Sequence, residues 1–197
     1  MFIRLFYAFY MEKTRCGWAT VNDQLYIDYH DNEWGKPVFD DNILFEFLVL
    51  ESFQAGLSWI TILRKRENFR QAFDNFNYQK IAKYGDKKIA QLLQNEGTIR
   101  HRGKIEATIN NAQKFIDIQK EFGSFSTYLW NFVNHTPIKN HFQSLSEIPA
   151  KTNLSEQIAK DLKKRGFKFM GATTVYAYMQ AVGLVNDHIL GCFCYTN

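Results

Sequence analysis

The sequence predicts an all-α protein, and three observations support that fold class. Apolar residues recur at helical spacing in several segments, whereas segments that alternate apolar and polar residues are scarce. The 197 residues include only three prolines and eleven glycines. The chain contains no low-complexity tract, internal repeat or charged linker. We therefore expect one domain over residues 12–197. Residues 1–11 read as an N-terminal extension or a misassigned start, with a short signal or membrane-contacting helix as the alternative.

The first predicted helix covers residues 40–54 and begins at two suitable N-cap residues, Asp40 and Asp41. Its apolar residues at helical spacing are Ile43, Leu44, Phe47, Leu48 and Leu50. The sequence AGL, residues 55–57, ends this helix. A second helix is expected from Ser58, with the basic run 64–66 facing solvent. Its inward residues are expected to be Ile60, Leu63, Phe69 and Phe73.

Five further helices are expected along the rest of the chain. The helix in 86–95 stops before Gly97, and the long helix in 102–123 ends at Gly123, because glycine favours helix termination. The remaining three lie in segments 125–134, 155–166 and 172–183.

Composition narrows the class of protein and its location. A net charge of +4, from 24 basic and 20 acidic residues, permits a polyanionic partner without requiring one. Three cysteines, an odd number, argue against a disulfide framework and favour a reducing cytoplasm. The apolar run near the N-terminus is shorter than the roughly 20 residues that span a bilayer. We expect a cytoplasmic protein that does not contact membranes.

Two cysteines and two histidines form a candidate metal site. His188 and Cys192 are four residues apart, and Cys16 and His30 lie near the other end of the domain. Together they supply the Cys₂His₂ donor set of a closed, structural zinc site that would join the two ends of the chain. The alternative is that both cysteines are buried apolar residues and both histidines are satisfied by hydrogen bonds. Cys194 is read as a bystander.

A basic segment precedes a short glycine-flanked turn in KDLKKRGFKFMGATT, residues 160–174. This pattern predicts a helix-hairpin-helix unit, in which backbone N–H groups and the start of the second helix face a phosphate group. The residues expected around that phosphate are Lys163, Lys164, Arg165, Gly166, Lys168 and Gly171. The alternative is an ordinary helical turn with a solvated basic face.

Aromatic residues and one carboxylate concentrate in the first third of the chain. Glu51 follows an apolar helical face, where a carboxylate is costly to bury without a partner. Nearby in sequence are Trp18, Tyr26, Tyr29, Trp34 and Trp59. This pattern indicates a ligand pocket. The alternative is that the aromatic residues pack the core while Glu51 faces solvent.

Six segments together resemble the bacterial 3-methyladenine DNA glycosylase I family, in order and over about residues 12–195. They are RCGW, YHDNEWG, QAGLSWIT, IRHRGKI, RGFKFMG and GLVNDHILGC. The resemblance implies a helix-hairpin-helix glycosylase fold with one structural Zn²⁺ on Cys16, His30, His188 and Cys192. It also implies that Glu51, Tyr29 and Trp59 contact the excised base, with Trp18, Trp34 and Tyr26 completing the pocket.

The implied reaction is hydrolysis of the N-glycosidic bond in alkylated double-stranded DNA, which releases 3-methyladenine and leaves an abasic site for base excision repair. The QAGL segment would support base flipping, with Gln54 beside the pocket and Gly56 or Leu57 filling the gap. No lysine stands where bifunctional relatives form a Schiff base, so strand cleavage is not expected. Many related glycosylases carry Asp in a V-D-x-H context, whereas this chain has Asn186, and we do not expect Asp187 to be catalytic.

A monomer that joins the nucleoid when it binds DNA is expected. Two other classes of protein fit parts of the pattern. A non-enzymatic binder of alkylated or distorted DNA would use the same hairpin and gap-filling segment but would not need to bind the free base. A zinc-stabilised helical scaffold for a protein partner would show little salt-dependent affinity for DNA.

Overall fold

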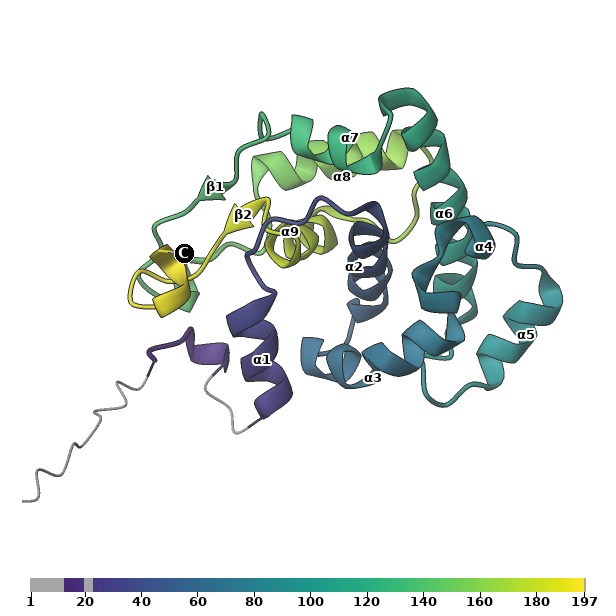
Figure 1. The fold of residues 1–197 in the computed structure, drawn as a ribbon, viewed down its shortest axis with the longest axis horizontal. Coiled ribbons are helices and arrows are strands. Elements are labelled where there is room, and N and C mark those ends of the chain that lie inside the picture. The colour runs from purple at the N-terminus through teal and green to yellow at the C-terminus, as the bar shows by residue number, and fades with distance from the viewer. Residues whose placement is uncertain (1–12, 20–22, 197) are drawn as a thin grey trace, which may run out of the picture.

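The computed structural model describes residues 13–19 and 23–196, so the predicted extension over residues 1–11 lies outside the described residues. The fold is helical and confirms the all-α prediction (Figure 1). Its longer helices are α1 (Gln24–Asn32), α2 (Asp41–Gln54), α3 (Trp59–Ala72), α5 (Asp86–Gln94), α6 (Arg102–Phe122), α7 (Phe125–Asn131), α8 (Asn153–Lys164) and α9 (Ala172–Ala181). The shorter elements are η1 (Gly17–Ala19), η2 (Asp74–Phe76), α4 (Tyr78–Ile81), η3 (Leu145–Glu147), η4 (Phe193–Thr196) and the two-residue strands β1 (Ile138–Lys139) and β2 (Val185–Asn186).

Helix α2 runs through the centre of the molecule. The Asp40 side chain accepts hydrogen bonds from the first backbone N–H groups of this helix, as the N-cap prediction requires. Every residue from 44 to 53 is buried, so the helix is covered on all sides instead of presenting one apolar face. Of the five apolar residues at helical spacing, Ile43 is 42 % exposed, because it lies in the first turn of the helix, before the buried stretch begins.

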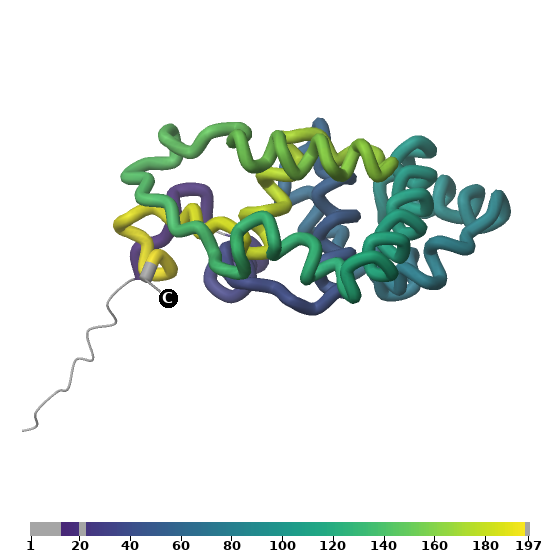
Figure 2. Tube along the Cα trace, turned by 90° about the horizontal axis from the view of Figure 1, so that it is seen from above, coloured from purple at the N-terminus to yellow at the C-terminus, as the bar shows by residue number. Residues whose placement is uncertain are grey.

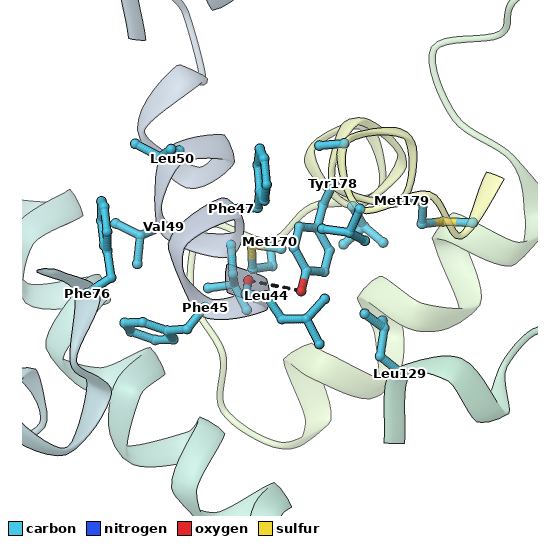
Figure 3. Close-up of a cluster of buried hydrophobic side chains, with 14 of the residues drawn as sticks. Leu44, Phe45, Phe47, Val49, Leu50, Phe76, Leu129, Met170, Tyr178 and Met179 are labelled. Carbon is cyan, nitrogen blue, oxygen red and sulfur yellow. Dashed lines mark hydrogen bonds between the residues drawn. The ribbon is translucent and has the colours of Figure 1, made fainter. Parts of the chain in front are cut away.

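The core forms where α2 meets α9 and the neighbouring helices (Figure 3). The hydroxyl of Tyr178 on α9 donates to the carbonyl oxygen of Leu44 at 3.1 Å, which satisfies a polar group inside the apolar cluster. Helices α3, α6 and α7 also contact α2. Glu51 therefore sits on a helix that neighbouring helices enclose.

Arg66 on α3 corrects the prediction that the basic run 64–66 faces solvent. Its side chain is buried and forms ion pairs with Glu46 at 2.5 Å and with Glu33 at 2.6 Å. Glu46 lies on α2, and Glu33 follows α1. The guanidinium therefore links three helices, which explains how a charged residue can replace an apolar one at this inward position.

Helices α8 and α9 are joined by a short turn over residues 165–171, which we call the hairpin. This arrangement confirms the predicted helix-hairpin-helix unit. Gly166 enters the hairpin with φ of +90°, a conformation that glycine adopts without strain. Phe169 has φ of +58° and is 43 % exposed, so a bulky side chain occupies the outer part of the turn.

The two ends of the described chain lie side by side, as both views show (Figures 1 and 2). A backbone hydrogen bond of 2.9 Å runs from Phe193 to Thr14, and β2 pairs in parallel with β1. Helix α1, which the sequence analysis did not predict, lies against this region. None of the helices in the described segments has the combined length and apolar character that crossing a bilayer requires.

Candidate functional site

The Cys/His cluster is formed by residues from both ends of the chain. Cys16 precedes η1, His30 lies on α1, and His188 and Cys192 follow β2. One ligand atom from each of these four residues lies within 4.8 Å of all the others, and all four residues are buried. The structure therefore brings together the four predicted metal ligands. It also explains their spacing, because His188 and Cys192 lie in a turn and not on a helix.

The outward-facing nitrogens of both histidines have hydrogen-bond partners. His30 Nδ1 lies 2.8 Å from a carboxylate oxygen of Asp31, which Arg15 also binds. His188 Nε2 lies 3.1 Å from the backbone carbonyl oxygen of Trp34. A carboxylate and a carbonyl oxygen both accept hydrogen bonds. These partners therefore place the protons on the outer nitrogens and leave the inner nitrogens free to bind a metal ion.

Cys194 is buried but lies at the edge of the cluster. Its backbone N–H donates to Cys192 Sγ at 3.4 Å, and its own sulfur lies 4.0 Å from the carbonyl oxygen of His30. Cys194 thus supports a predicted ligand, while its thiol also approaches His30 and Asp31 in an alternative grouping.

A second site is a cavity of about 350 Å³ beside α2. All six residues predicted to touch a base line it, together with Gln54. They are Trp18, Tyr26, Tyr29, Trp34, Glu51 and Trp59. The ring centroids of Trp18 and Tyr26 are 4.9 Å apart, and those of Tyr29 and Trp59 are 5.2 Å apart. A cavity of this volume lined by aromatic faces suits a planar ligand of small-molecule size.

Two polar atoms in this cavity have no hydrogen-bond partner among the described residues: Glu51 Oε2 and Trp59 Nε1. Glu51 is only 4 % exposed, so water does not solvate its carboxyl group as it would at a surface. Buried polar atoms without partners are rare and costly. Two residues of the cavity lining therefore each keep one buried, unsatisfied polar atom, as expected of a site whose ligand completes the hydrogen bonds.

Burial changes the protonation chemistry of this site. Loss of solvation raises the pKa of Glu51 to about 8, because the charged form is disfavoured away from water. Burial, with the nearby Glu51 next in importance, also raises the pKa of Tyr29 well above its ordinary value. The site therefore favours an ionised Glu51 only when a cationic or hydrogen-bonding group enters it.

One wall of the cavity is formed by residues that the sequence does not predict. Leu145 and Ile148 come from the segment between β1 and α8, and Ala177 and Gln180 come from α9. No spacing pattern links these residues to the aromatic cluster, since they lie more than eighty positions from Trp59 in the sequence. Leu145 is 37 % exposed at the rim.

The cavity and the Cys/His cluster share structural elements. The Trp34 ring lies 4.7 Å from the His188 ring, and the Trp18 ring lies 5.0 Å from the His30 ring, measured between centroids. Tyr29 of the cavity directly precedes His30 of the cluster. The cluster therefore packs directly against Trp18 and Trp34 in the wall of the cavity.

The two segments predicted to contact DNA lie at the ends of helices. Residues 55–58, which we call the plug loop, connect α2 to α3. Within it, Gly56 has φ of +84° and Leu57 is 39 % exposed. In and beside the hairpin, Lys164, Lys168 and Gly171 are exposed. Arg165 differs, because its guanidinium pairs with Glu121 at 2.7 Å and with Asp161 at 2.7 Å.

Asp187 is held by structural hydrogen bonds. Its carboxylate accepts hydrogen bonds from Asn140 at 2.6 Å, Tyr176 at 2.6 Å and Gln180 at 2.7 Å, and it is fully buried. Asn186, next to it, accepts a hydrogen bond from the backbone of His188. These contacts place Asp187 in the packing between β2 and α9.

Comparisons with known proteins agree with this site. The chain matches the sequence model of the methyladenine glycosylase family over residues 18–195. It is 51 % identical over 181 residues to DNA-3-methyladenine glycosylase 1 of Escherichia coli, covering 92 % of this chain and 96 % of that protein. It is 52 % identical over 184 residues to DNA-3-methyladenine glycosylase of Haemophilus influenzae, covering 93 % and 99 % respectively.

Solved structures of the same family also resemble this fold. A crystal structure of a single-residue variant of 3-methyladenine DNA glycosylase I in complex with 3-methyladenine superposes with a TM-score of 0.88 and 38 % sequence identity. The superposition covers 91 % of this chain and 96 % of that one. Sequence and structure agree over nearly the whole chain. The chain belongs to the methyladenine glycosylase family.

Proposed function

We propose that this protein is a monofunctional DNA glycosylase that excises 3-methyladenine from alkylated double-stranded DNA. It hydrolyses the N-glycosidic bond and yields the free base and an abasic site, the first step of base excision repair. The observation that carries the proposal is the pair of unpartnered atoms, Glu51 Oε2 and Trp59 Nε1, in an aromatic cavity large enough for a purine.

Charge explains the choice of base. Adenine methylated at N3 in DNA is cationic, and aromatic faces attract a desolvated cation by up to about 2 kcal/mol. The aromatic walls formed by Trp18, Tyr29 and Trp59 supply such faces. An ionised Glu51 adds the opposite charge, and the entering cation lowers the cost of ionising that buried carboxyl group. Normal adenine is neutral and receives neither contribution.

The base must leave the duplex to reach this cavity, which costs a few kcal/mol and costs least for a damaged base. The plug loop supports this step, because Leu57 is exposed and Gly56 allows the turn to approach DNA closely. Phosphates bind at the hairpin, where exposed Lys164 and Lys168 lie beside the start of α9. Arg165 contributes less in the free protein because two carboxylates already neutralise it.

The chemistry requires little acid catalysis, since a cationic purine is already a good leaving group. Glu51 binds the base and stabilises positive charge as the glycosidic bond breaks. Water completes the hydrolysis. Asp187 takes no part, because its carboxylate holds three structural hydrogen bonds.

The Cys/His cluster holds one structural zinc ion in this proposal. Tetrahedral zinc with bonds of about 2.3 Å to sulfur and about 2.0–2.1 Å to nitrogen separates its sulfur and nitrogen ligands by about 3.5 Å. The corresponding distances are 3.6 Å from Cys16 to His188, 3.4 Å from Cys192 to His30 and 3.5 Å from Cys192 to His188. Four protein ligands leave no open position for substrate, so the ion ties the chain ends together and supports the cavity wall.

The protein acts on DNA as a monomer, since one chain supplies the whole cavity, the plug loop and the hairpin. Its DNA substrate places it in the cytoplasm, associated with the nucleoid.

Incubation with alkylated duplex DNA, followed by chromatography of the released bases, tests this proposal. The expected result is release of 3-methyladenine in preference to other methylated bases, with an intact strand until the abasic site is cleaved chemically. An absence of released base would contradict the enzyme and favour a DNA-binding protein without catalysis.

A further inference from the structure

Helix α6 contacts both segments proposed to touch DNA, although neither contact belongs to the cavity or the metal cluster. Lys104, near the start of α6, reaches the plug loop. Asn111, two turns later, reaches the hairpin. Residues seven positions apart lie on nearly the same face of a helix, separated by about 10 Å along its axis.

Lys104 binds the chain where α2 ends. Its ammonium group donates to the carbonyl oxygens of Phe53 and Ala55, each at 2.8 Å, and Lys104 is only 6 % exposed. The last carbonyl groups of a helix lack intrahelical partners and carry the negative end of its dipole, so a lysine there is favourable. Within the described part of the chain, these two carbonyls are the hydrogen-bond partners of the ammonium group. A buried cation is thus used to fix the backbone directly before Gly56 and Leu57.

Asn111 binds the hairpin in a similar way. Its amide donates to the carbonyl oxygen of Lys168 at 2.9 Å and accepts from the N–H of the same residue at 2.8 Å. The preceding residue, Asn110, donates to the carbonyl oxygen of Gly166 at 2.8 Å. Asn111 is fully buried, so these bonds satisfy a polar side chain that would otherwise be costly inside the fold.

We propose that Lys104 and Asn111 are positioning residues that make α6 the frame between the plug loop and the hairpin. Lys104 fixes the plug loop, Asn111 fixes the hairpin, and the rigid helix between them sets the distance at which Leu57 enters a duplex held at its phosphates. Neither residue touches the base. This inference rests on the proposed function and adds to it the device that keeps the two DNA-contacting segments in register.

The first test compares two variants by hydrogen exchange and by activity. Lys104→Met is expected to raise amide exchange in residues 55–58 but not in the hairpin, and to slow single-turnover excision from duplex DNA about tenfold. Asn111→Ala is expected to raise exchange in the hairpin but not in the plug loop, and to weaken duplex affinity about tenfold. Both variants are expected to bind free 3-methyladenine within about twofold of wild type, because the cavity is unchanged.

Matched controls lie on the same helix. Lys120→Met removes an exposed lysine, and Gln113→Ala removes an amide that bonds Ala82 at 3.0 Å, away from both segments. Both controls are expected to retain wild-type exchange and excision. Lys104→Arg retains the charge and N–H donors and is expected to recover most of the excision rate. If Lys104→Met does not fold, Lys104→Gln, which keeps an N–H donor, undergoes the same measurements.

A double-mutant cycle with Leu57→Ala isolates the plug loop. The loss of excision caused by Leu57→Ala is expected to be smaller in the Lys104→Met background than in wild type. In that background the plug loop is already displaced, so Leu57 contributes less to the excision rate. Additive losses, or an equal loss from Lys120→Met, would overturn the role of Lys104. A wild-type protein that releases no base would instead contradict the proposed function, and the exchange measurements would still decide the contacts of α6.

Discussion

The Cys/His cluster and the aromatic cavity are both buried polar sites, but they differ in how their polar atoms are satisfied. In the cluster, each histidine has an outer partner, Asp31 for one and the Trp34 carbonyl for the other, and the inner atoms face one another. In the lining of the cavity, Glu51 Oε2 and Trp59 Nε1 are buried and have no hydrogen-bond partner among the described residues. The first arrangement suits an ion that stays, and the second suits a ligand that enters and leaves.

The difference separates a site that stabilises the folded chain from a site that binds a ligand. The cluster stabilises the folded chain, whereas the cavity leaves polar groups unsatisfied and so costs stability in the absence of ligand. A change in the cluster is expected to act mainly on unfolding. A change in the cavity is expected to act mainly on binding and excision, and on unfolding through the pH-dependent ionisation of Glu51.

The largest effect is expected from Cys192→Ser. Loss of one ligand from a four-ligand structural site is expected to remove most bound zinc and to lower the free energy of unfolding by about 3–5 kcal/mol, less than the 10–16 kcal/mol of small zinc-dependent peptides. Metal analysis measures the zinc content, and urea unfolding measures the free energy of unfolding. The matched control is Cys194→Ser, which changes another buried thiol two residues away and is expected to retain the metal. Full zinc content in Cys192→Ser would exclude the assigned ligand set.

Glu51→Gln is expected to act on excision and not on the fold. Removal of the negative charge that stabilises a developing cation is expected to slow single-turnover excision about 100-fold, with duplex affinity nearly unchanged. A Glu106→Gln variant, which alters an exposed carboxylate on α6, serves as the control. Excision at the wild-type rate by Glu51→Gln would remove Glu51 from its proposed role.

The same variant is expected to change how stability depends on pH. The folded protein holds the Glu51 pKa at about 8, above the ordinary value of 4.5, so the folded state retains a proton that the unfolded chain releases. Wild-type stability therefore falls as pH rises between these values. The variant lacks this loss, so its free energy of unfolding relative to wild type is expected to increase from pH 5 to pH 8, by on the order of 1–3 kcal/mol. A pH-independent difference between the two proteins would contradict the buried, unpaired carboxyl group.

Trp59→Phe is expected to have the smallest effect. The ring face remains and the N–H donor is lost, so affinity for free 3-methyladenine is expected to fall about fivefold, with little change in stability. Trp130→Phe serves as the control, because the Trp130 N–H already donates to the Val38 carbonyl oxygen at 2.8 Å and its loss removes a hydrogen bond within the fold. That control is expected to lower stability and to leave base affinity unchanged. Calorimetric titration and thermal unfolding compare the two.

Sequence reasoning reached the elements that have strong local signals. The N-cap at Asp40, the glycines at 123 and 166 and the apolar periodicity place α2, α6, α8 and α9 to within a few residues. Helix α1 was missed because its segment, Gln24–Asn32, buries few apolar residues and is held by tertiary contacts. Arg66 was misplaced because its partners, Glu33 and Glu46, are distant in sequence.

The candidate sites were predicted to a similar extent. The sequence predicts the four Cys/His residues and the six cavity residues, and the structure places each set together. Leu145 and Ile148 could not be found, since neither residue type nor spacing connects them with the aromatic residues. The roles of Lys104 and Asn111 were also not predicted. Their partners are backbone atoms, and every residue type has these, so the sequence does not indicate them.

The most direct test of the central claim is a titration of the wild-type protein and of Glu51→Gln with free 3-methyladenine, followed by tryptophan fluorescence. The cavity contains three of the four tryptophans, so occupancy should be visible. We expect saturable quenching of the wild-type protein and at least tenfold weaker binding of 3-methyladenine by Glu51→Gln, because the released base is uncharged and depends on its hydrogen bonds to the cavity. Equal binding by wild type and Glu51→Gln would contradict the account.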